Sequence, residues 1–389
     1  MYSPGVVGLG HLRRQLLIAQ TLAKSSPGLA ILLIAETRQA GVFSVSPGVD
    51  CLILPALRKD ADGGFQPRYL GVSTDDLIAL RARTIHAALA TFEPDVFIVD
   101  KLPRGALCEL DPTLEMLRER RTRCVLGLRD ILDEPEAVAR DWARTGDLQI
   151  IRDRFHAVWV YGDAAVYDLV REYDLPADLV AKVRYAGYLD QRRRLDFVDV
   201  ASDPFPALRL PPGRLALCLL GGGQNGAALA EAFSAAPLPA DTNGVVITGP
   251  FMDEDVKRRL HRSAEGQPHL RILELVHEPA MLVERSDCIV AIAGYNTTSE
   301  VLAFQKRALL VPRIRPRQEQ WIRARRLQQM GLVDVLHPDA LSPAMIGGWL
   351  DQDGCSTRPA REAIDFNGLE RLPALLQEVL TANSNQGVS

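Results

Sequence analysis

The sequence predicts an α/β protein made of two tandem doubly wound, Rossmann-like domains. Short apolar segments alternate with longer amphipathic segments along the whole chain. The short segments are apolar without alternation, which is typical of parallel strands covered by helices on both faces. The same pattern resumes after one proline-rich segment, so it indicates two domains rather than one. A chain of 389 residues that is 47% hydrophobic is long and apolar enough to bury two cores.

In the first half of the chain, five apolar segments predict strands and four amphipathic segments predict helices. The strands are expected over residues 31–35, 51–55, 96–100, 124–129 and 157–162. The helices are expected over residues 12–24, 75–92, 134–152 and 164–173. Only Met1–Pro4 precede the first glycine-containing loop. The strand that should open this domain is therefore either very short, or the natural start lies upstream.

The second half repeats the pattern with five further strands and five further helices. The strands are expected over residues 215–220, 244–249, 270–275, 287–293 and 308–313. The helices are expected over residues 225–234, 254–263, 297–305, 319–330 and 343–351.

A charged and proline-rich segment separates the two predicted domains. It begins with three consecutive arginines and contains Pro204, Pro206, Pro211 and Pro212. Because proline disfavours helix interiors and central strands alike, the segment predicts a linker. The predicted organisation is a domain over residues 1–190, a linker over 191–213, a domain over 214–380 and a disordered tail over 381–389.

Composition narrows the function classes. Lys and Arg number 45 against 49 Asp and Glu, a net charge of −4, which argues against a dedicated nucleic-acid binder. The six cysteines form no Cys-x-x-Cys pair and no metal-ligand spacing, which favours a reducing, cytoplasmic setting. No apolar segment approaches the ~18–20 residues that span a bilayer, and no signal peptide is visible.

The first candidate for chemistry is His11, which follows Gly8 and Gly10 at the start of the first predicted helix. Imidazole accepts protons near neutral pH, so His11 is a candidate general base, the alternative being a histidine that caps a turn. Asp100 ends a predicted strand and could orient His11 in a His–Asp dyad. Its alternatives are a helix cap or a partner for Lys101 or Arg104.

The second candidate is a glycine loop over residues 221–226, Gly-Gly-Gly-Gln-Asn-Gly, directly after a predicted strand. A strand, a glycine loop and a helix capped by Asn225 would offer backbone N–H groups to a phosphate. The loop lacks the Lys-Ser/Thr of a P-loop and does not fit Gly-x-Gly-x-x-Gly. Nucleotide hydrolysis and a dinucleotide fingerprint are therefore not indicated, and tight packing is the alternative.

The third and most specific candidate is Gly294-Tyr-Asn-Thr-Thr-Ser-Glu300, after another predicted strand. Asn296 or Thr297 can cap the following helix, whose N-terminus suits phosphate oxygens. Glu300 lies one turn in, where its carboxylate could accept both hydroxyls of a ribose. The alternative is a capping box between Glu300 and Thr297.

Here the sequence resembles a known family. The order Gly294-Tyr-Asn-Thr-Thr-x-Glu300, Val311-Pro312 and Glu319-Gln320 is similar to the donor box of GT-B nucleotide-sugar glycosyltransferases, including plant secondary-product glycosyltransferases. It also resembles the C-terminal domain (family 28) of the peptidoglycan N-acetylglucosaminyltransferase that makes lipid II. The whole chain is similar to a bacterial group of predicted glycosyltransferases marked by Gly-Leu-Gly-His-Leu-Arg-Arg, here 8–14, and Gly-Leu-Arg-Asp-Ile-Leu-Asp, here 127–133.

The resemblance implies roles for particular residues. It implies an N-terminal acceptor domain, a C-terminal nucleotide-sugar donor domain and a cleft between them. His11 takes the position of the family's general base, with Asp100 as its partner. The donor diphosphate would be bordered by Gly222, Gly223, Gln224, Asn296, Thr297 and Thr298. Glu300 would hold the ribose, Glu319 and Gln320 would hold the sugar hydroxyls, and the base would lie after Gly249 or near residues 275–279.

The implied reaction is a metal-independent, inverting hexosyl transfer from a nucleoside-diphosphate sugar, UDP-linked, to a hydroxyl of a small-molecule or lipid-linked acceptor. No cofactor or metal is expected. Asp60-Ala-Asp62 matches an Asp-x-Asp metal motif but lies in a charged loop, where a solvated turn is the better interpretation. The plant box has a histidine at the position of Ile292, so phosphate binding would depend on backbone N–H groups and hydroxyls.

Three alternatives remain open at this stage. The first is an epimerase or hydrolase of the same architecture, for which Glu274 and Glu278 are candidate carboxylates. The second is a sugar-nucleotide-binding protein without catalysis. The third is a weak membrane-surface contact through Arg13 and Arg14, although solvated arginines on a packed helix are favoured. The acceptor loops are expected over residues 59–73 and 102–110, and the sequence predicts neither the acceptor nor the oligomeric state.

Overall fold

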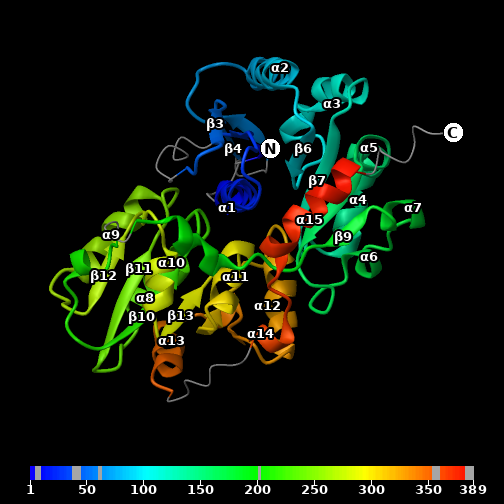
Figure 1. Cartoon of the computed structure of the whole chain (residues 1–389). Helices are drawn as coiled ribbons and strands as arrows, with labels where there is room; N and C mark the ends of the chain where they lie inside the picture. The colour runs from blue at the N-terminus through cyan, green and yellow to red at the C-terminus, as the bar shows by residue number, and fades with distance from the viewer. Residues whose placement is uncertain (5–9, 37–44, 60–63, 200–202, 353–359, 382–389) are drawn as a thin grey trace. The chain divides into compact units, whose positions relative to one another are not determined.

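The computed structural model describes the chain except residues 5–9, 37–44, 60–63, 200–202, 353–359 and 382–389. The chain forms two compact units (Figure 1). Unit 1 comprises Met1–Leu189 and the segment from Asn367 onward, and unit 2 comprises Asp190–Phe366. The predicted division is close to this one but differs in two places. The predicted linker belongs to unit 2, and the last helix belongs to unit 1.

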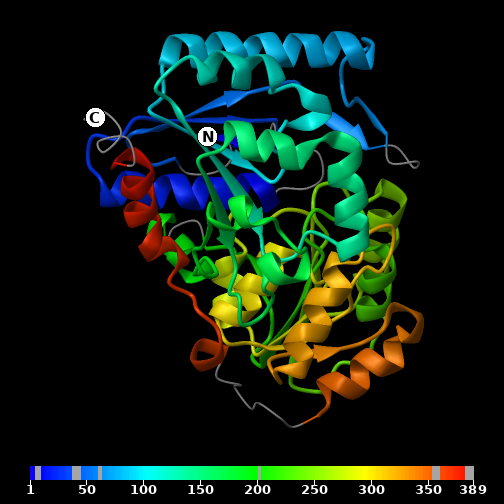
Figure 2. The ribbon, with the colours of Figure 1, turned by 90° about the vertical axis from the view of Figure 1, so that its right-hand side faces the viewer.

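Hydrogen bonds explain why the last helix joins unit 1. Helix α15 (Gly368–Thr381) follows an antiparallel bridge between Leu189 and Asn367. Its Arg371 donates to the carbonyl of Ala186 at 2.8 Å, and its Gly368 N–H donates to the carbonyl of Tyr188 at 3.1 Å. The helix packs beside α1 (Gly10–Ser25), as Figure 2 shows.

Unit 1 is built on a seven-stranded parallel sheet in the order β3-β2-β1-β6-β7-β8-β9. The strands are β1 (Tyr2–Ser3), β2 (Ile31–Ala35), β3 (Val49–Ile53), β6 (Val96–Asp100), β7 (Arg123–Arg129), β8 (Ala157–Tyr161) and β9 (Val183–Tyr185). Most of the uninterrupted apolar segments are strands buried in the core, as predicted. The exception is β3, which begins two residues earlier than the predicted 51–55 and buries only Val49. The opening strand is present and very short, and it pairs with both β2 and β6.

Two of the helices predicted for unit 1 differ from the helices observed. Besides α1 and α15 they are α2 (Thr74–Phe92), α3 (Asp111–Arg118), α4 (Pro135–Thr145), α5 (Asp147–Arg154), α6 (Leu169–Glu172) and α7 (Ala177–Val180). The single helix predicted over 134–152 is two helices, because Gly146 adopts a left-handed conformation with φ of 69°. The helix predicted over 164–173 is reduced to α6. An antiparallel hairpin, β4 (Leu57–Lys59) and β5 (Phe65–Pro67), occupies part of a predicted acceptor loop.

Unit 2 contains a six-stranded parallel sheet in the order β12-β11-β10-β13-β14-β15. Its strands are β10 (Arg214–Leu219), β11 (Thr242–Ile247), β12 (Leu270–Leu273), β13 (Cys288–Ala291), β14 (Arg307–Leu310) and β15 (Asp334–Val335). Its helices are α8 (Ala227–Ser234), α9 (Glu254–Ala264), α10 (Ala280–Arg285), α11 (Tyr295–Ala303), α12 (Glu319–Gln329), α13 (Pro343–Leu350) and α14 (Ala360–Ala363). The segment predicted as a linker contains the 3-10 helices η3 (Gln191–Phe197) and η5 (Pro206–Leu208).

Each sheet has a topological switch point, where the strand order reverses beside its first strand. In unit 1 this point lies between β1 and β6, and in unit 2 it lies between β10 and β13. In open parallel sheets, ligands bind outside the carboxyl ends of the strands at such points. We therefore expect ligands to bind at the loops that follow these four strands. None of the helices in the part of the chain described above has both the length and the apolarity to cross a membrane.

Candidate functional site

The switch point of unit 1 holds a buried group of three side chains. His11, on the first turn of α1, lies with its Nδ1 2.6 Å from Oδ2 of Asp100, the last residue of β6. Arg14, one turn further along α1, donates to both carboxylate oxygens of Asp100 at 2.7 and 2.8 Å. Asp100 is fully buried, and the His11 side chain is 15% exposed. The predicted contact between His11 and Asp100 is thus present, with an arginine as a third member.

The electrostatics of this group keep the imidazole neutral. Burial lowers the pKa of His11 to about 4; Asp100 acts against that shift, and the charges of Arg14 and Lys101 add to it. Burial alone would raise the pKa of Asp100, but Arg14 and His11 together hold it well below its ordinary value. At neutral pH the group is a carboxylate paired with a guanidinium beside a neutral imidazole. With Nδ1–H donating to Asp100, Nε2 is the unprotonated nitrogen that can accept a proton.

Arg14 corrects a sequence-based expectation. It was expected either in solvent or, with Arg13, in a basic and apolar membrane-contacting patch. The side chain of Arg14 is only 2% exposed, and Leu12, Leu16 and Leu17 are also buried. These four side chains are therefore not available to form an exposed basic and apolar patch, and Arg14 lies against Asp100 of unit 1.

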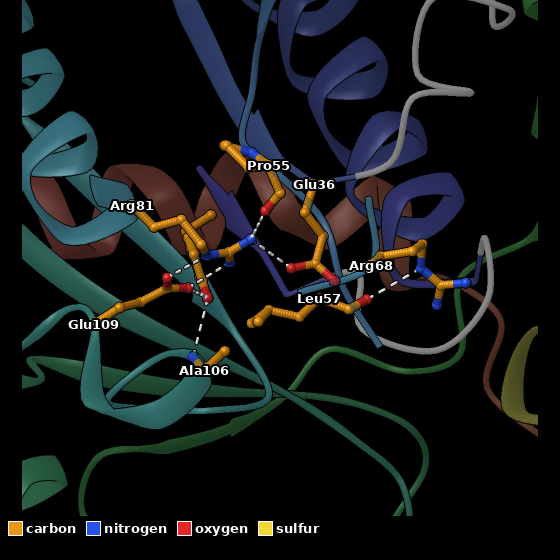
Figure 3. Close-up of polar contacts among 8 residues, drawn as sticks. Glu36, Pro55, Leu57, Arg68, Arg81, Ala106 and Glu109 are labelled. Carbon is orange, nitrogen blue, oxygen red and sulfur yellow. Dashed lines mark hydrogen bonds and ion pairs between the residues drawn. The ribbon is translucent and has the colours of Figure 1, made fainter. Parts of the chain in front are cut away.

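A second buried polar network lies in unit 1, at the end of β2 (Figure 3). Arg81 of α2 is fully buried and contacts two carboxylates, Glu36 at 2.8 Å and Glu109 at 2.6 Å. It also donates to the carbonyl of Pro55 at 2.6 Å. The hydroxyl of Tyr2 donates to Glu109 and accepts from the N–H of Ala106. This network anchors part of one segment expected to form an acceptor loop, residues 102–110, through Ala106 and Glu109. Sequence reasoning did not identify any of its members.

The network contains two carboxylates for one guanidinium, and Glu36 is the less well paired of the two. Among the residues that the structure describes, only Oε2 of Glu36 has a hydrogen-bond partner, and Glu36 is 1% exposed. Burial raises the pKa of Glu36 to about 7, an effect that Arg81 partly offsets and Glu109 increases. Glu36 therefore begins to carry an imperfectly compensated charge as the pH rises through neutrality.

Replacing Glu36 with glutamine is expected to stabilise the protein at pH 8. The folded-state pKa lies above the ordinary value of 4.5. The proton on Glu36 therefore stabilises the fold at acid pH, and this contribution is lost as the pH rises through about 7. Because glutamine resembles the protonated acid, E36Q should raise the free energy of unfolding at pH 8 by about 1–3 kcal/mol, with little change at pH 5. Urea unfolding at both pH values tests this, with the exposed Glu115→Gln as the control; equal effects at both pH values would contradict it.

In unit 2, three loops meet at the carboxyl edge beside the switch point. Gly221 follows β10, and a Cβ added to it would lie 3.8 Å from the side chain of Ile292, which follows β13. Gly223 has φ of 90° and lies so close to the segment after β11 that a Cβ would come within 2.2 Å of the carbonyl oxygen of Thr248. The carbonyl of Gly222 accepts from the N–H of Phe251 at 3.0 Å. Gly223 is thus required for backbone packing between the loop after β10 and the loop after β11.

The helices at this edge begin at glycines rather than at the expected polar caps. Helix α8 has Gly226, not Asn225, at its N-cap, and α11 has Gly294 in place of Asn296 or Thr297. Neither cap makes a side-chain hydrogen bond. Asn296 and Thr297 therefore lie inside the first turn of α11, and the capping-box alternative for Glu300 does not apply. Gly222 is partly exposed, whereas Gln224 is exposed on the loop before α8.

The remaining predicted donor residues are held by contacts inside unit 2. Thr298 and Glu300 are buried on α11, 0% and 3% exposed. Glu319 is paired with Arg313 at 2.6 Å, and the side-chain oxygen of Gln320 accepts from the backbone N–H of Arg313 at 3.0 Å. Sequence reasoning did not identify Arg313 as the partner of Glu319, although Arg313 lies only six residues before it.

Arg323 links α12 to the loop before α11. It is fully buried and donates to the carbonyl of Ala293 at 3.0 Å. Through it, α12 is tied to the segment that carries four of the nine predicted donor residues. The roles assigned to the predicted donor residues stay predictions.

The carboxylates considered for an epimerase have structural partners. Glu274 is exposed and lies 2.8 Å from Lys257, and Glu278 accepts from the N–H of Ala280 at 3.1 Å. Asp60 and Asp62 lie outside the described residues, as do Gly8 and the predicted tail from residue 382. Within the described ranges, no group of three His, Cys, Asp or Glu side chains is arranged to hold a metal ion.

Known structures share this architecture. The chain is similar to CalG4, the calicheamicin glycosyltransferase, at 14% identity over 98% of both chains with a TM-score of 0.60. It is similar to UGT71G1 of Medicago truncatula, solved with UDP-glucose, at 13% identity over 97% of both chains and a TM-score of 0.60. The UDP-GlcNAc 2-epimerase of Neisseria meningitidis, bound to UDP-GlcNAc, is 12% identical over 95% of this chain and 98% of its own, with a TM-score of 0.57.

These similarities, with two parallel sheets of Rossmann-like order, show that the chain has the GT-B fold. The fold was predicted correctly from the sequence. Comparison of the sequence with models of protein families and with curated proteins finds no match. Because both glycosyltransferases and epimerases have this fold, the choice between them depends on the residues of the site.

Proposed function

We propose that the protein is a glycosyltransferase that moves a sugar from a nucleoside-diphosphate donor, UDP-linked, to a hydroxyl of a small-molecule or lipid-linked acceptor. The observation that carries the proposal is the neutral, partly exposed His11 held by buried Asp100 at the switch point of unit 1. A base that is neutral at physiological pH is what activation of an acceptor hydroxyl needs. An enzyme that acted on the nucleotide sugar alone would not need a base for an acceptor.

Donor binding is assigned to the carboxyl edge of unit 2. The first-turn N–H groups of α8 and α11 point out of the helix ends, and the helix dipoles favour negative charge there. Both helices begin at a glycine, and at Gly294, the N-cap of α11, a Cβ would have no atom within 4 Å, which leaves space for a phosphate oxygen beside the backbone. Asn296, Thr297 and Thr298 complete the predicted diphosphate site. Glu300, Glu319 and Gln320 are assigned to the ribose and the sugar, with Arg313 fixing the position of Glu319.

The proposed reaction is a single displacement. Nε2 of His11 accepts the proton of the acceptor hydroxyl, and the hydroxyl oxygen forms a bond to the anomeric carbon of the donor sugar. The bond from that carbon to the diphosphate oxygen breaks, and the configuration inverts. The charge on the departing nucleoside diphosphate is stabilised by the helix N-termini, so that the proposed transfer is metal-independent.

The proposal is tested by following a panel of nucleoside-diphosphate sugars with and without candidate acceptors. The proposal expects one nucleotide to raise the melting temperature of the full chain, since a ligand that binds only the folded state stabilises it. It also expects release of nucleoside diphosphate only when an acceptor hydroxyl is present. Isomerisation of the sugar without an acceptor would instead support the epimerase that the structural similarity to UDP-GlcNAc 2-epimerase suggests. Binding without turnover under all conditions would support a non-catalytic binding protein.

Replacing Thr297 with valine is expected to weaken donor binding about tenfold. The substitution keeps the side-chain shape and removes one hydroxyl from the first turn of α11, and a hydrogen bond to a charged group is worth about 1.5–3 kcal/mol. Isothermal titration of the donor measures the change. Thr242→Val is the matched control, because Thr242 lies at the opposite, amino end of the sheet. Equal affinities of T297V and T242V would remove Thr297 from the donor site.

A further inference from the structure

We propose that Arg14 is a positioning residue for the His11 base: by contacting both oxygens of Asp100, it fixes the carboxylate and keeps the imidazole in its neutral, proton-accepting form. The proposal rests on the proposed function and deepens it, because it concerns how that site is held ready at physiological pH. Arg14 does not itself contact the reacting atoms in this account. It acts through Asp100.

The guanidinium of Arg14 contacts both members of the His11–Asp100 dyad. Nη2 of Arg14 lies 2.7 and 2.8 Å from the two oxygens of Asp100 and 3.1 Å from Nδ1 of His11. Arg14 and Asp100 are both almost completely buried, at 2% and 0% exposed. Arg14 and His11 are three residues apart on α1, so one turn of helix presents both to the end of β6. Removing the rotational freedom of the carboxylate also fixes the imidazole that donates to it.

The charge balance explains the effect on the imidazole. Among the described residues, the charged groups that act on the imidazole of His11 are Asp100 and Lys101, at the end of β6, and Arg14 on its own helix. An isolated carboxylate beside a histidine favours the protonated imidazole. Here Arg14 already balances the charge of Asp100, so a proton on His11 would add a net positive charge to a buried group. The imidazole therefore remains neutral and able to accept a proton.

The test is a titration of the His11 imidazole by NMR in the full chain, with no substrate present. The His11 signals are assigned by their loss in His11→Gln. The wild-type pKa is expected at about 4. In Arg14→Met the uncompensated Asp100 should raise the pKa of His11 by at least about one pH unit, and Arg14→Lys, which keeps the charge, should raise it less. Arg13→Met, which removes the neighbouring positive charge from the same helix, is the control. An unchanged titration in R14M, or an equal change in R13M, overturns the proposal.

Two further measurements make the result decisive. If R14M does not fold, as loss of the buried ion pair would allow, Arg14→Gln carries the test. Its amide is polar but uncharged, so the pKa of His11 should still rise, and a His11 titration identical to that of the wild type overturns the proposal. In transfer assays, the acid limb of the kcat/KM profile should move to higher pH in R14K, with donor KM unchanged, which a merely structural role would not produce. A failed transfer assay in the wild type would refute the proposed function, whereas the NMR titration would still report on Arg14.

Discussion

Replacing His11 with glutamine is expected to lower kcat for sugar transfer by about 10²–10⁴-fold, the contribution of a positioned general base. Glutamine keeps a polar side chain of similar reach but cannot accept a proton from the acceptor hydroxyl. Donor affinity should not change, because the predicted donor residues all belong to unit 2. The measurement is steady-state transfer kinetics beside isothermal titration of the donor.

The matched control for this substitution is His86→Gln, on α2 of the same unit. It should transfer sugar at the wild-type rate. The informative contrast is with Glu300→Ala, which should weaken donor binding. Unchanged transfer in H11Q, together with lost donor binding in E300A, would show that the base assignment is wrong while the donor site is right.

The second large effect is expected on stability, from Gly223→Ala. The backbone at this glycine has φ of 90°, which costs an alanine about 1–2 kcal/mol. The added Cβ would also lie 2.2 Å from the carbonyl oxygen of Thr248 and 2.9 Å from the backbone nitrogen of Met252. Because all these atoms are backbone, neither loop can move aside without breaking the packing of the other. We expect G223A to lower the free energy of unfolding by about 4 kcal/mol or more. We also expect it to abolish donor binding.

Gly331→Ala is the control for G223A. Gly331 shares the left-handed conformation, with φ of 72°, but a Cβ there would have no atom within 4 Å. Urea unfolding of the two variants separates the conformational cost from the collision. A loss in G223A no larger than that in G331A would show that the two loops are not packed as described.

Much of the fold could be predicted because it depends on local patterns. Continuous apolar segments such as 96–100 and 124–129 identify strands buried on both faces, and both matched β6 and β7 within one residue. The order of these strands then brings His11 beside Asp100, although 89 residues separate them. This is why a strand-end aspartate and a helix-start histidine could be paired from sequence alone.

Other features depend on partners that no local pattern specifies. Arg14 lies on an amphipathic helix, where an arginine is ordinarily solvated, and its ion pair with the buried Asp100 favours its inward position. Arg81 meets Glu36 and Glu109 across 45 and 28 residues, with no spacing signal. Helix α15 joins unit 1 through hydrogen bonds to the backbone carbonyls of Ala186 and Tyr188, and no local pattern in its sequence predicts these bonds. Polar residues beside a helix start suggested caps at Asn225 and Asn296, whereas glycines occupy both N-cap positions.

The glycine loop after β10 and the first turn of α11 are proposed to bind a nucleoside diphosphate. Hydrogen exchange of the full chain with and without UDP tests this proposal most directly, because bound phosphate protects the backbone N–H groups that contact it. In the wild type, we expect UDP to slow the exchange of the backbone N–H groups of residues 221–226 and 295–299. In the Gly223→Ala variant, UDP should not slow exchange in either segment. Saturating UDP that leaves both segments unprotected, or protects only segments of unit 1, would contradict it.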